Sequence, residues 1–309
     1  MNAIVFKPIY QERVWGGRDL ENKLGRTLAK GKVIGESWEI VVRPEAQSLM
    51  EDGRSIRELI QAEPEAIMGS GWPGERPFPI LVKWLDCQEK LSLQVHPPAE
   101  VASELGGEPK TECWYIAEAE PHATLMAGLK HGVTKKQFED ALRDNALEPL
   151  VHSIPVQAGE SIFIPSGRLH AIGGGNLILE IQQNSDTTYR VYDWGRVGLD
   201  GQPRQLHIEA SLKSTHFDDF EPETLKPTGS SQNLAKSDVF NLRKEVLRAG
   251  ESITFPTGAP TIISLLEGKL IDQNDTAYER GVNALLPAAG YFQLTASEPT
   301  ELLVTSDFT

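Results

Sequence analysis

Cysteine, long apolar runs and basic charge are all scarce in this chain of 309 residues. Its two cysteines, Cys87 and Cys113, cannot build a disulfide framework. The N-terminal stretch MNAIVFKPIYQERVW lacks the basic, apolar and small segments of a signal peptide, and no apolar run is long enough to cross a membrane. We therefore expect a cytoplasmic protein with no membrane partner.

The deficit of basic residues narrows the choice of partners further. Lysine and arginine number 30 against 44 acidic residues, so the formal net charge is −14. Nucleic acids and anionic membranes need a basic footprint, and neither is expected to bind here. A small anionic substrate stays possible, but it requires a local cluster of basic side chains.

The chain has one central stretch, QAGESIFIPSGRLH at residues 157–170, whose spacing is G-x5-P-x-G-x2-H. The run 162–164 predicts a short buried strand, Pro165 ends its ladder and Gly167 permits a tight turn. His170 would then leave the turn at the mouth of the sheet. The spacing resembles the second signature of the cupin superfamily, whose small barrels hold a metal. A hairpin whose histidine merely faces water is the alternative.

The C-terminal part repeats this pattern without its chemistry. AGESITFPTG at 249–258 shares its first five letters with AGESIFIPSG at 158–167. The positions equivalent to ligands hold residues that cannot bind a metal, namely Pro256, Gly258, Ile262 or Ile263, and Phe292. The alternative is a chance similarity of two turns.

The predicted fold is mainly β, with two cupin (double-stranded β-helix, or jelly-roll) barrels and a few short helices. A metal-binding domain is expected over 1–217, with a short helical insert near 134–150. A linker or irregular segment is expected over 218–236, and a degenerate second cupin domain over 237–309.

Metal-ligand candidates come from three segments that a barrel would bring together. In LSLQVH at 91–96 the alternation places Gln94 and His96 on one face, Glu112 follows on a later strand, and His170 comes from the central turn. Two imidazoles, a carboxylate and an amide suit zinc and also admit manganese, iron or cobalt. The other five histidines are expected at the surface or as satisfied core residues.

Four motifs together resemble one family. LSLQVHP (91–97), PKTECWYI (109–116), IPSGRLHA (164–171) and SDTTYR (185–190) are similar to type I mannose-6-phosphate isomerases in their short bacterial form. The resemblance implies one zinc ion per chain, held by Gln94, His96, Glu112 and His170. It implies the interconversion of mannose 6-phosphate and fructose 6-phosphate through a cis-enediol.

The resemblance also suggests roles for neighbouring side chains. Lys110 is the candidate base, since a nearby cation should lower its pKa; a plain ion pair with Glu112 is the alternative. Arg190 would stabilise the enediolate charge, and Asp186 would orient Arg190 or relay protons. Pro109 stands where larger members have a histidine, so no proton shuttle is expected there.

Substrate-binding candidates complete the set. Ser92 and Lys83 match positions of the phosphate pocket, although Lys83 could simply be an edge lysine. Trp15 either lines the sugar or packs in the core. A dioxygenase-type cupin or a non-catalytic sugar-phosphate-binding cupin is the alternative function. A monomer or a weak homodimer is expected.

Overall fold

The computed structural model describes residues 1–308, which form a mainly β protein. The chain separates into two compact units that are interleaved in sequence. Unit 1 comprises residues 1–9, 38–83 and the chain from Pro227 onward, and unit 2 comprises residues 10–37 and 84–226. The expectation of consecutive domains over 1–217 and 237–309 stays a prediction.

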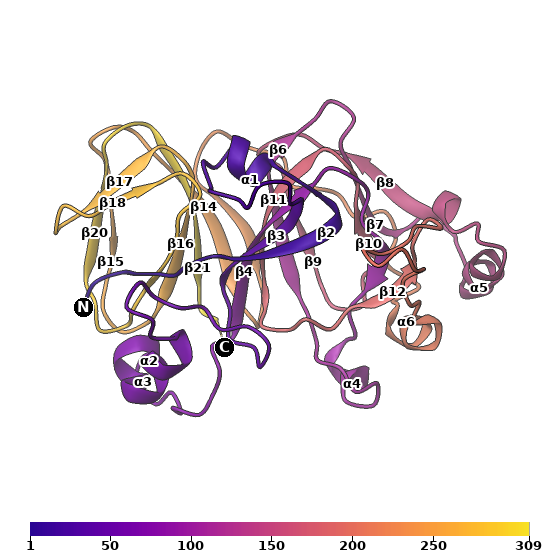
Figure 1. Ribbon diagram of the computed structural model, residues 1–309, viewed down its shortest axis with the longest axis horizontal. Helices are drawn as coiled ribbons and strands as arrows, with labels where there is room; N and C mark the ends of the chain where they lie inside the picture. Colours follow the sequence, from indigo (N-terminus) through magenta and orange to yellow (C-terminus); the bar gives the residue numbers. More distant parts are fainter. Residues whose placement is uncertain (309) are drawn as a thin grey trace. The chain divides into compact units, whose positions relative to one another are not determined.

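Unit 2 contains a sheet whose strand order is β12-β5-β10-β7-β8. Its strands are β5 (Leu93–Val95), β7 (Thr124–Leu129), β8 (Val151–Pro155), β10 (His170–Ile172) and β12 (Tyr189–Tyr192). Figure 1 labels four of these strands, β7, β8, β10 and β12. Another sheet has the order β2-β3-β4-β11-β6-β9. Its strands are β2 (Ile9–Gly17), β3 (Ile34–Ile40), β4 (Ile80–Cys87), β6 (Glu112–Ala119), β9 (Ser161–Ile164) and β11 (Asn176–Gln183).

Apolar side chains from both sheets share one core in unit 2. Ile116 on β6, Leu125 on β7 and Ile172 on β10 are almost fully buried members of the same cluster. Burial of such side chains contributes about 1.5 to 3 kcal/mol each relative to exposure. The core therefore fixes which residues of each strand face inward, and so also sets the direction of the polar side chains among them.

Short helices lie at the periphery of unit 2: α1 (Asp19–Asn22), α4 (Ala99–Ala102), α5 (Lys135–Arg143), the 3-10 turn η1 (Glu148–Leu150) and α6 (Ile208–Ser214). The predicted helix near 134 is confirmed as α5. Thr134 and Gln137 form a capping box at its start, and Phe138 and Leu142 are buried. This helix packs one apolar face on the unit and leaves the other to solvent.

Unit 1 also holds two sheets, with the orders β1-β19-β16-β21-β14-β13 and β15-β20-β17-β18. Their strands are β1 (Ile4–Val5), β13 (Gln232–Lys236), β14 (Asn241–Leu247), β15 (Ser252–Phe255), β16 (Thr261–Glu267), β17 (Lys269–Asp272), β18 (Ala277–Glu279), β19 (Asn283–Leu286), β20 (Phe292–Ala296) and β21 (Thr300–Ser306). Helices α2 (Ile56–Ala62) and α3 (Pro64–Met68) follow one another beside them (Figure 1).

Some of the positions that the repeat pattern aligns with ligands hold buried apolar side chains in unit 1. Ile263 and Phe292 are buried and belong to one hydrophobic cluster. The segment 218–236, expected to be irregular, ends in strand β13, which pairs with β14. Turn-forming and charged residues dominate this segment, so its composition gave no indication of a strand.

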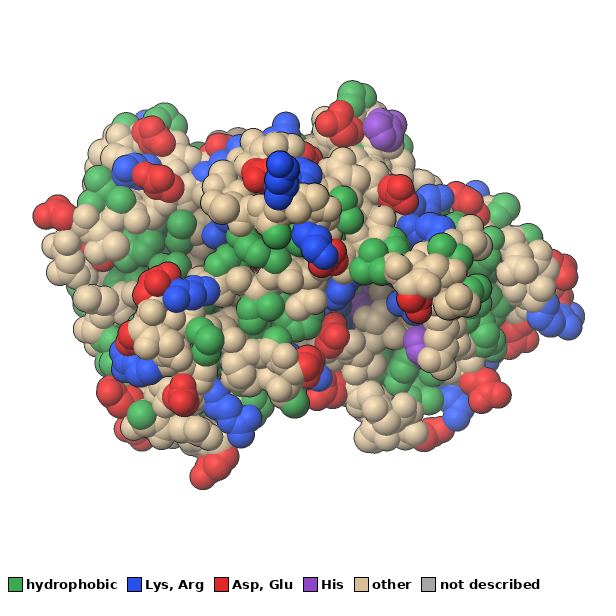
Figure 2. Space-filling view, viewed as in Figure 1, with side chains coloured by type: hydrophobic (Ala, Val, Ile, Leu, Met, Phe, Trp, Pro, Cys, Tyr) green, Lys and Arg blue, Asp and Glu red, His purple; other side chains and the backbone are tan. Residues whose placement is uncertain are grey.

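None of the helices within residues 1–308 is long and apolar enough to cross a bilayer. Figure 2 shows acidic and basic side chains interspersed over the viewed face, with apolar atoms between them.

Candidate metal centre and active site

Three predicted ligand residues meet inside unit 2. The ligand atoms of His96, Glu112 and His170 all lie within 4.8 Å of one another, and each side chain is at most 1% exposed. His96 Nε2 is 3.4 Å from Glu112 Oε2, and His170 Nε2 is 3.7 Å from Glu112 Oε1. Neither Nε2 has a hydrogen-bond partner among the described residues. Buried polar atoms are rarely left unpartnered, so this geometry fits a cation held between them.

Backbone carbonyls fix the orientation of both imidazoles. His96 Nδ1 lies 2.8 Å from the Thr187 carbonyl oxygen, and His170 Nδ1 lies 2.9 Å from the Arg168 carbonyl oxygen. A carbonyl can only accept, so each Nδ1 carries the proton and each Nε2 presents a lone pair to the cluster. Such second contacts are typical of metal-binding histidines.

The electrostatic surroundings favour the protonation states that metal ligands need. Burial, with a contribution from Lys110, lowers the pKa of His96 to about 3, and burial also lowers the pKa of His170. Burial alone would raise the pKa of Glu112, but Lys110 and the two histidines outweigh it and hold that pKa well below its usual range. Neutral imidazoles and an ionised carboxylate are the binding forms.

Lys110 is held between two carboxylates. Its Nζ lies 2.9 Å from Glu112 Oε2 and 3.6 Å from Glu180 Oε1. Burial acts to lower the pKa of Lys110, but Glu112 and Glu180 outweigh it and raise that pKa. Trp114 Nε1 donates to Glu180 Oε2 at 3.1 Å, which fixes the second carboxylate. The two carboxylates therefore raise the pKa of Lys110, whereas a nearby cation is expected to lower it.

Gln94 is connected to this cluster by strand register. It is paired with His170 on β10 and with Arg190 on β12, so the three residues lie in line across adjacent strands. Directly opposed residues share a face of a sheet, and alternation adds His96 to that face. The register thus puts the amide, both imidazoles and the arginine on one side.

The turn of the central motif holds its two ends together. Gly167 has a φ of +91°, as expected of a glycine that permits a tight turn, and its N–H donates to the His96 carbonyl at 2.8 Å. Ser166 Oγ accepts from the Lys110 N–H at 3.1 Å. Arg168 makes a two-bond ion pair with Asp219, each bond 2.8 Å long. The turn therefore positions His170, His96 and Lys110 together.

A cavity of about 420 Å³ adjoins Gln94. It is lined by Arg13, Trp15, Glu36, Leu91, Ser92, Gln94, Asp186, Thr188, Arg190 and Arg204. Three arginines line this cavity beside two carboxylates, so basic side chains outnumber acidic ones there although the chain has a net charge of −14.

Comparison with known proteins bears directly on this arrangement. The family model for the catalytic domain of type I phosphomannose isomerase matches residues 4–107. The probable mannose-6-phosphate isomerase GmuF of Bacillus subtilis is 33% identical over 306 residues, covering 96% of this chain and 94% of the relative. The chain belongs to the type I phosphomannose isomerase family. The mannose-6-phosphate isomerase ManA of the same organism is 37% identical over 68% of this chain and 67% of its own length.

The solved structures agree with this family. The crystal structure of the mannose 6-phosphate isomerase from Bacillus subtilis superposes with a TM-score of 0.87 at 29% identity, over 99% of both chains. The predicted family and mainly β cupin fold are thereby confirmed. The relatives favour an isomerase over the dioxygenase-type and non-catalytic alternatives.

Five of the predicted residues line the cavity of this isomerase: Trp15, Ser92, Gln94, Asp186 and Arg190. Trp15 is also only 4% exposed and packs in the core, as the packing interpretation expects. Contact of its ring with the sugar stays a prediction. Lys83 belongs to unit 1, where it is buried with Nζ 5.5 Å from the centre of the Trp38 ring.

Sequence reasoning missed four charged residues of the isomerase. Arg13 and Glu36 line the cavity and are joined by an ion pair of 2.9 Å. Arg204 lines it as well, and Glu180 pairs with Lys110. Of these four residues, only Glu180 had a signal in the sequence. It is the single charged residue of the strand segment NLILEIQQ.

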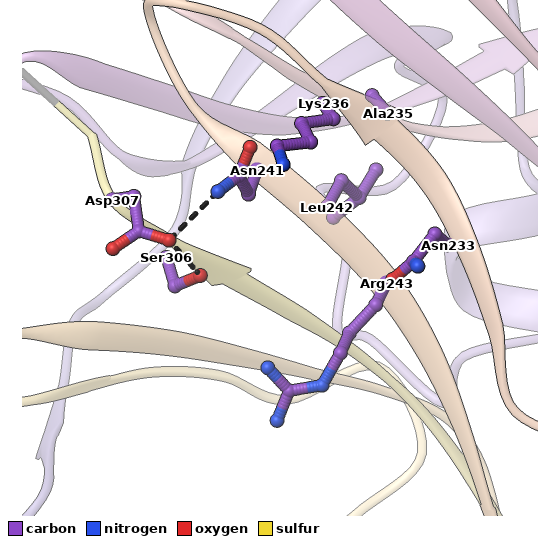
Figure 3. Close-up of a pocket in the computed structure, with 8 residues that line it drawn as sticks. All are labelled: Asn233, Ala235, Lys236, Asn241, Leu242, Arg243, Ser306 and Asp307. Atoms are coloured by element: carbon purple, nitrogen blue, oxygen red, sulfur yellow. Dashed lines mark hydrogen bonds between the residues drawn. The ribbon is translucent and has the colours of Figure 1, made fainter.

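A second cavity, of about 240 Å³, lies in unit 1 beside β13, β14 and β21 (Figure 3). Asn241 donates to Asp307 at 2.7 Å, and Arg243 Nε donates to Glu245 instead of to either of them. None of the predicted site residues lines it.

Proposed function

We propose that this chain interconverts mannose 6-phosphate and fructose 6-phosphate with the help of one divalent zinc ion. The observation that carries the proposal is the pair of unpartnered Nε2 atoms of His96 and His170, converging on Glu112 beside a cavity lined by arginines. The reaction moves a proton between C1 and C2 of the open-chain sugar through a cis-enediol.

Gln94, His96, Glu112 and His170 would hold the metal. Two nitrogen and two oxygen donors without a thiolate suit a catalytic zinc site, although manganese, iron and cobalt accept similar sets. When bound, the cation would polarise the sugar oxygens at C1 and C2 and stabilise negative charge on them.

Lys110 and Arg190 would act on the reacting atoms. We assign the proton transfer to Lys110, which lies 2.9 Å from the proposed ligand Glu112. With the metal bound, Glu112 would share its charge with the cation, and this would weaken the main cause that raises the pKa of Lys110. Arg190 carries positive charge at the cavity and would stabilise the enediolate, with Asp186 on the same cavity as its partner.

The phosphate group would bind in the arginine-lined cavity. Ser92 supplies a hydroxyl there, and Arg13 and Arg204 add positive charge. Lys83 is not among the residues that line this cavity, so its contact with the phosphate stays a prediction. Arg204 is held by Asp193, with Nε 2.7 Å from Oδ2. Trp15 would line the sugar. The cytoplasmic location and the monomeric or weakly dimeric state stay predictions.

A metal-removal experiment tests the function. Dialysis against a chelator should abolish conversion of mannose 6-phosphate, measured by coupling fructose 6-phosphate formation to a second enzyme, and zinc should restore it. Lys110→Ala and Arg190→Ala should each lower kcat/KM by about 100-fold or more while metal content stays unchanged. Full activity of the metal-free protein would refute the metal mechanism. Undiminished turnover in both variants would refute the two roles.

A further inference from the structure

We propose that His207 is a positioning residue for Arg190, holding this arginine against the active-site cavity from the open edge of β12. The inference rests on the proposed role of Arg190. His207 itself does not line the cavity. It would therefore act only through the arginine.

The contacts between the two residues are reciprocal. The Arg190 N–H donates to His207 Nδ1 at 3.0 Å, and the His207 N–H donates to the Arg190 carbonyl at 2.8 Å. Two residues earlier, the Gln205 carbonyl accepts from Arg190 Nη1 at 2.9 Å. A three-residue segment thus fixes both the backbone and the guanidinium of Arg190.

These bonds determine how Arg190 faces its neighbour across the sheet. β12 is the edge strand, paired only with β5 within its sheet, and Arg190 is opposite Gln94. Both backbone groups of Arg190 point to His207 and hence away from β5. In an antiparallel ladder this makes Arg190 and Gln94 a non-hydrogen-bonded pair, the kind whose side chains come closest. Movement of the Arg190 backbone would therefore change the cavity beside a proposed metal ligand.

His207 is itself anchored by the helix that follows it. Its carbonyl accepts from the Ser211 N–H at 2.8 Å in the first turn of α6, and Ser211 is fully buried. Arg190 Nε is buried without a hydrogen-bond partner, so only Nη1 ties this guanidinium to the protein through a described hydrogen bond. Nη2 makes no described hydrogen bond and stays available for an anionic ligand.

The bond to Arg190 requires one protonation state of His207. A backbone N–H can only donate, so Nδ1 must present its lone pair and any ring proton must sit on Nε2. The charged group that faces His207 is Arg190, and the titratable Tyr189 ring lies 5.9 Å away with its hydroxyl bonded to the Leu105 carbonyl. Burial and Arg190 lower the pKa of His207, which preserves the neutral ring. Protonation would replace the acceptor by a donor and break the bond.

Two substitutions separate positioning from bulk structure. His207→Leu removes the acceptor and should lower kcat/KM for mannose 6-phosphate by about 10- to 100-fold, mainly through kcat, with bound metal unchanged. His207→Asn places Oδ1 where Nδ1 was and should restore kcat/KM to within about threefold of wild type. His122→Asn, at an exposed turn of the same unit, is the matched control and should have no effect.

The pH profile supplies a readout that a purely structural role would not move. Wild-type kcat/KM should fall on the acid side with an apparent pKa below about 6.5, as His207 becomes protonated. The fall caused by His207 should be absent in His207→Asn, because an amide does not titrate. Wild-type rates in His207→Leu would overturn the proposal, as would failure of His207→Asn to restore them or an unchanged acid limb. An inactive wild type would instead refute the proposed function.

Discussion

At the scale of single residues, the turn between β9 and β10 depends on Gly167. Its φ of +91° lies in the left-handed region, where side chains with a Cβ are strained. A Cβ built there would lie 2.6 Å from Cε1 of His216. Because its N–H bonds the His96 carbonyl, this one residue joins the segments that carry two proposed ligands.

Gly167→Ala should therefore weaken both the fold and the metal site. We expect a loss of about 1 to 2 kcal/mol in the free energy of unfolding, from urea titrations. Metal affinity, from competition with a chromophoric chelator, should fall by about 10-fold because the two histidines lose their common support.

Gly132 provides the control for this substitution. Its φ is +83°, and nothing lies within 4 Å of a Cβ placed there. Gly132→Ala should thus show the conformational strain without any loss of metal affinity. Equal metal affinity in the two variants would contradict the role assigned to Gly167.

At the scale of elements, α5 is expected to stabilise the fold without contributing to the reaction. Thr134 Oγ1 accepts from the Gln137 N–H at 3.2 Å, and the Gln137 side chain accepts from the Thr134 N–H at 2.8 Å. Thr134→Ala should cost about 1 kcal/mol of unfolding free energy, measured in urea, and leave kcat/KM unchanged. Thr134→Ser, which keeps the cap, should lose at most a few tenths of that amount. A fall in kcat/KM of Thr134→Ala in the folded protein would show that α5 takes part in catalysis.

Elements whose signals are local could be predicted from the sequence. The apolar stripe of Phe138, Ala141 and Leu142 identified α5. Alternation along 91–96 put Ser92, Gln94 and His96 on one face, with Gln94 in the three-residue strand β5 and the other two beside its ends. The convergence of His96, Glu112 and His170 followed from the combined motif spacing and the expected barrel.

Features set by pairing between distant strands could not be predicted in this way. Glu180 contacts Lys110 because β11 and β6 pair with Glu180 opposite Trp114, a register that no local pattern reveals. Arg204 reaches the cavity from a loop, and its ion pair with Asp193 spans eleven residues. The contact of His207 with Arg190 was missed for the same reason, since a lone histidine carries no sign of its partner.

At the scale of the whole molecule, acid stability depends on how the excess of carboxylates is paired. Asp193 is 6% exposed and accepts from both Arg196 and Arg204. Burial alone would raise its pKa, but the two arginines outweigh burial and lower it. The unfolded chain therefore binds a proton at this carboxyl before the folded protein does. Its contribution to stability is complete above the unfolded pKa of about 3.9 and is lost as the pH falls through the lower folded value.

Asp193→Asn tests this linkage. At neutral pH the variant should lose on the order of 3 kcal/mol of unfolding free energy, because two partly buried arginines lose their shared anion. Urea titrations from about pH 7 to about pH 3 should then show a shallower decline below about pH 4 than in wild type, since the titrating group is gone. If the unfolding free energies of the two proteins decline in parallel as the pH falls, carboxylates other than Asp193 cause the acid sensitivity. Because Arg204 also lines the cavity, KM for mannose 6-phosphate should rise in the same variant even at neutral pH, where the remainder of the fold is intact.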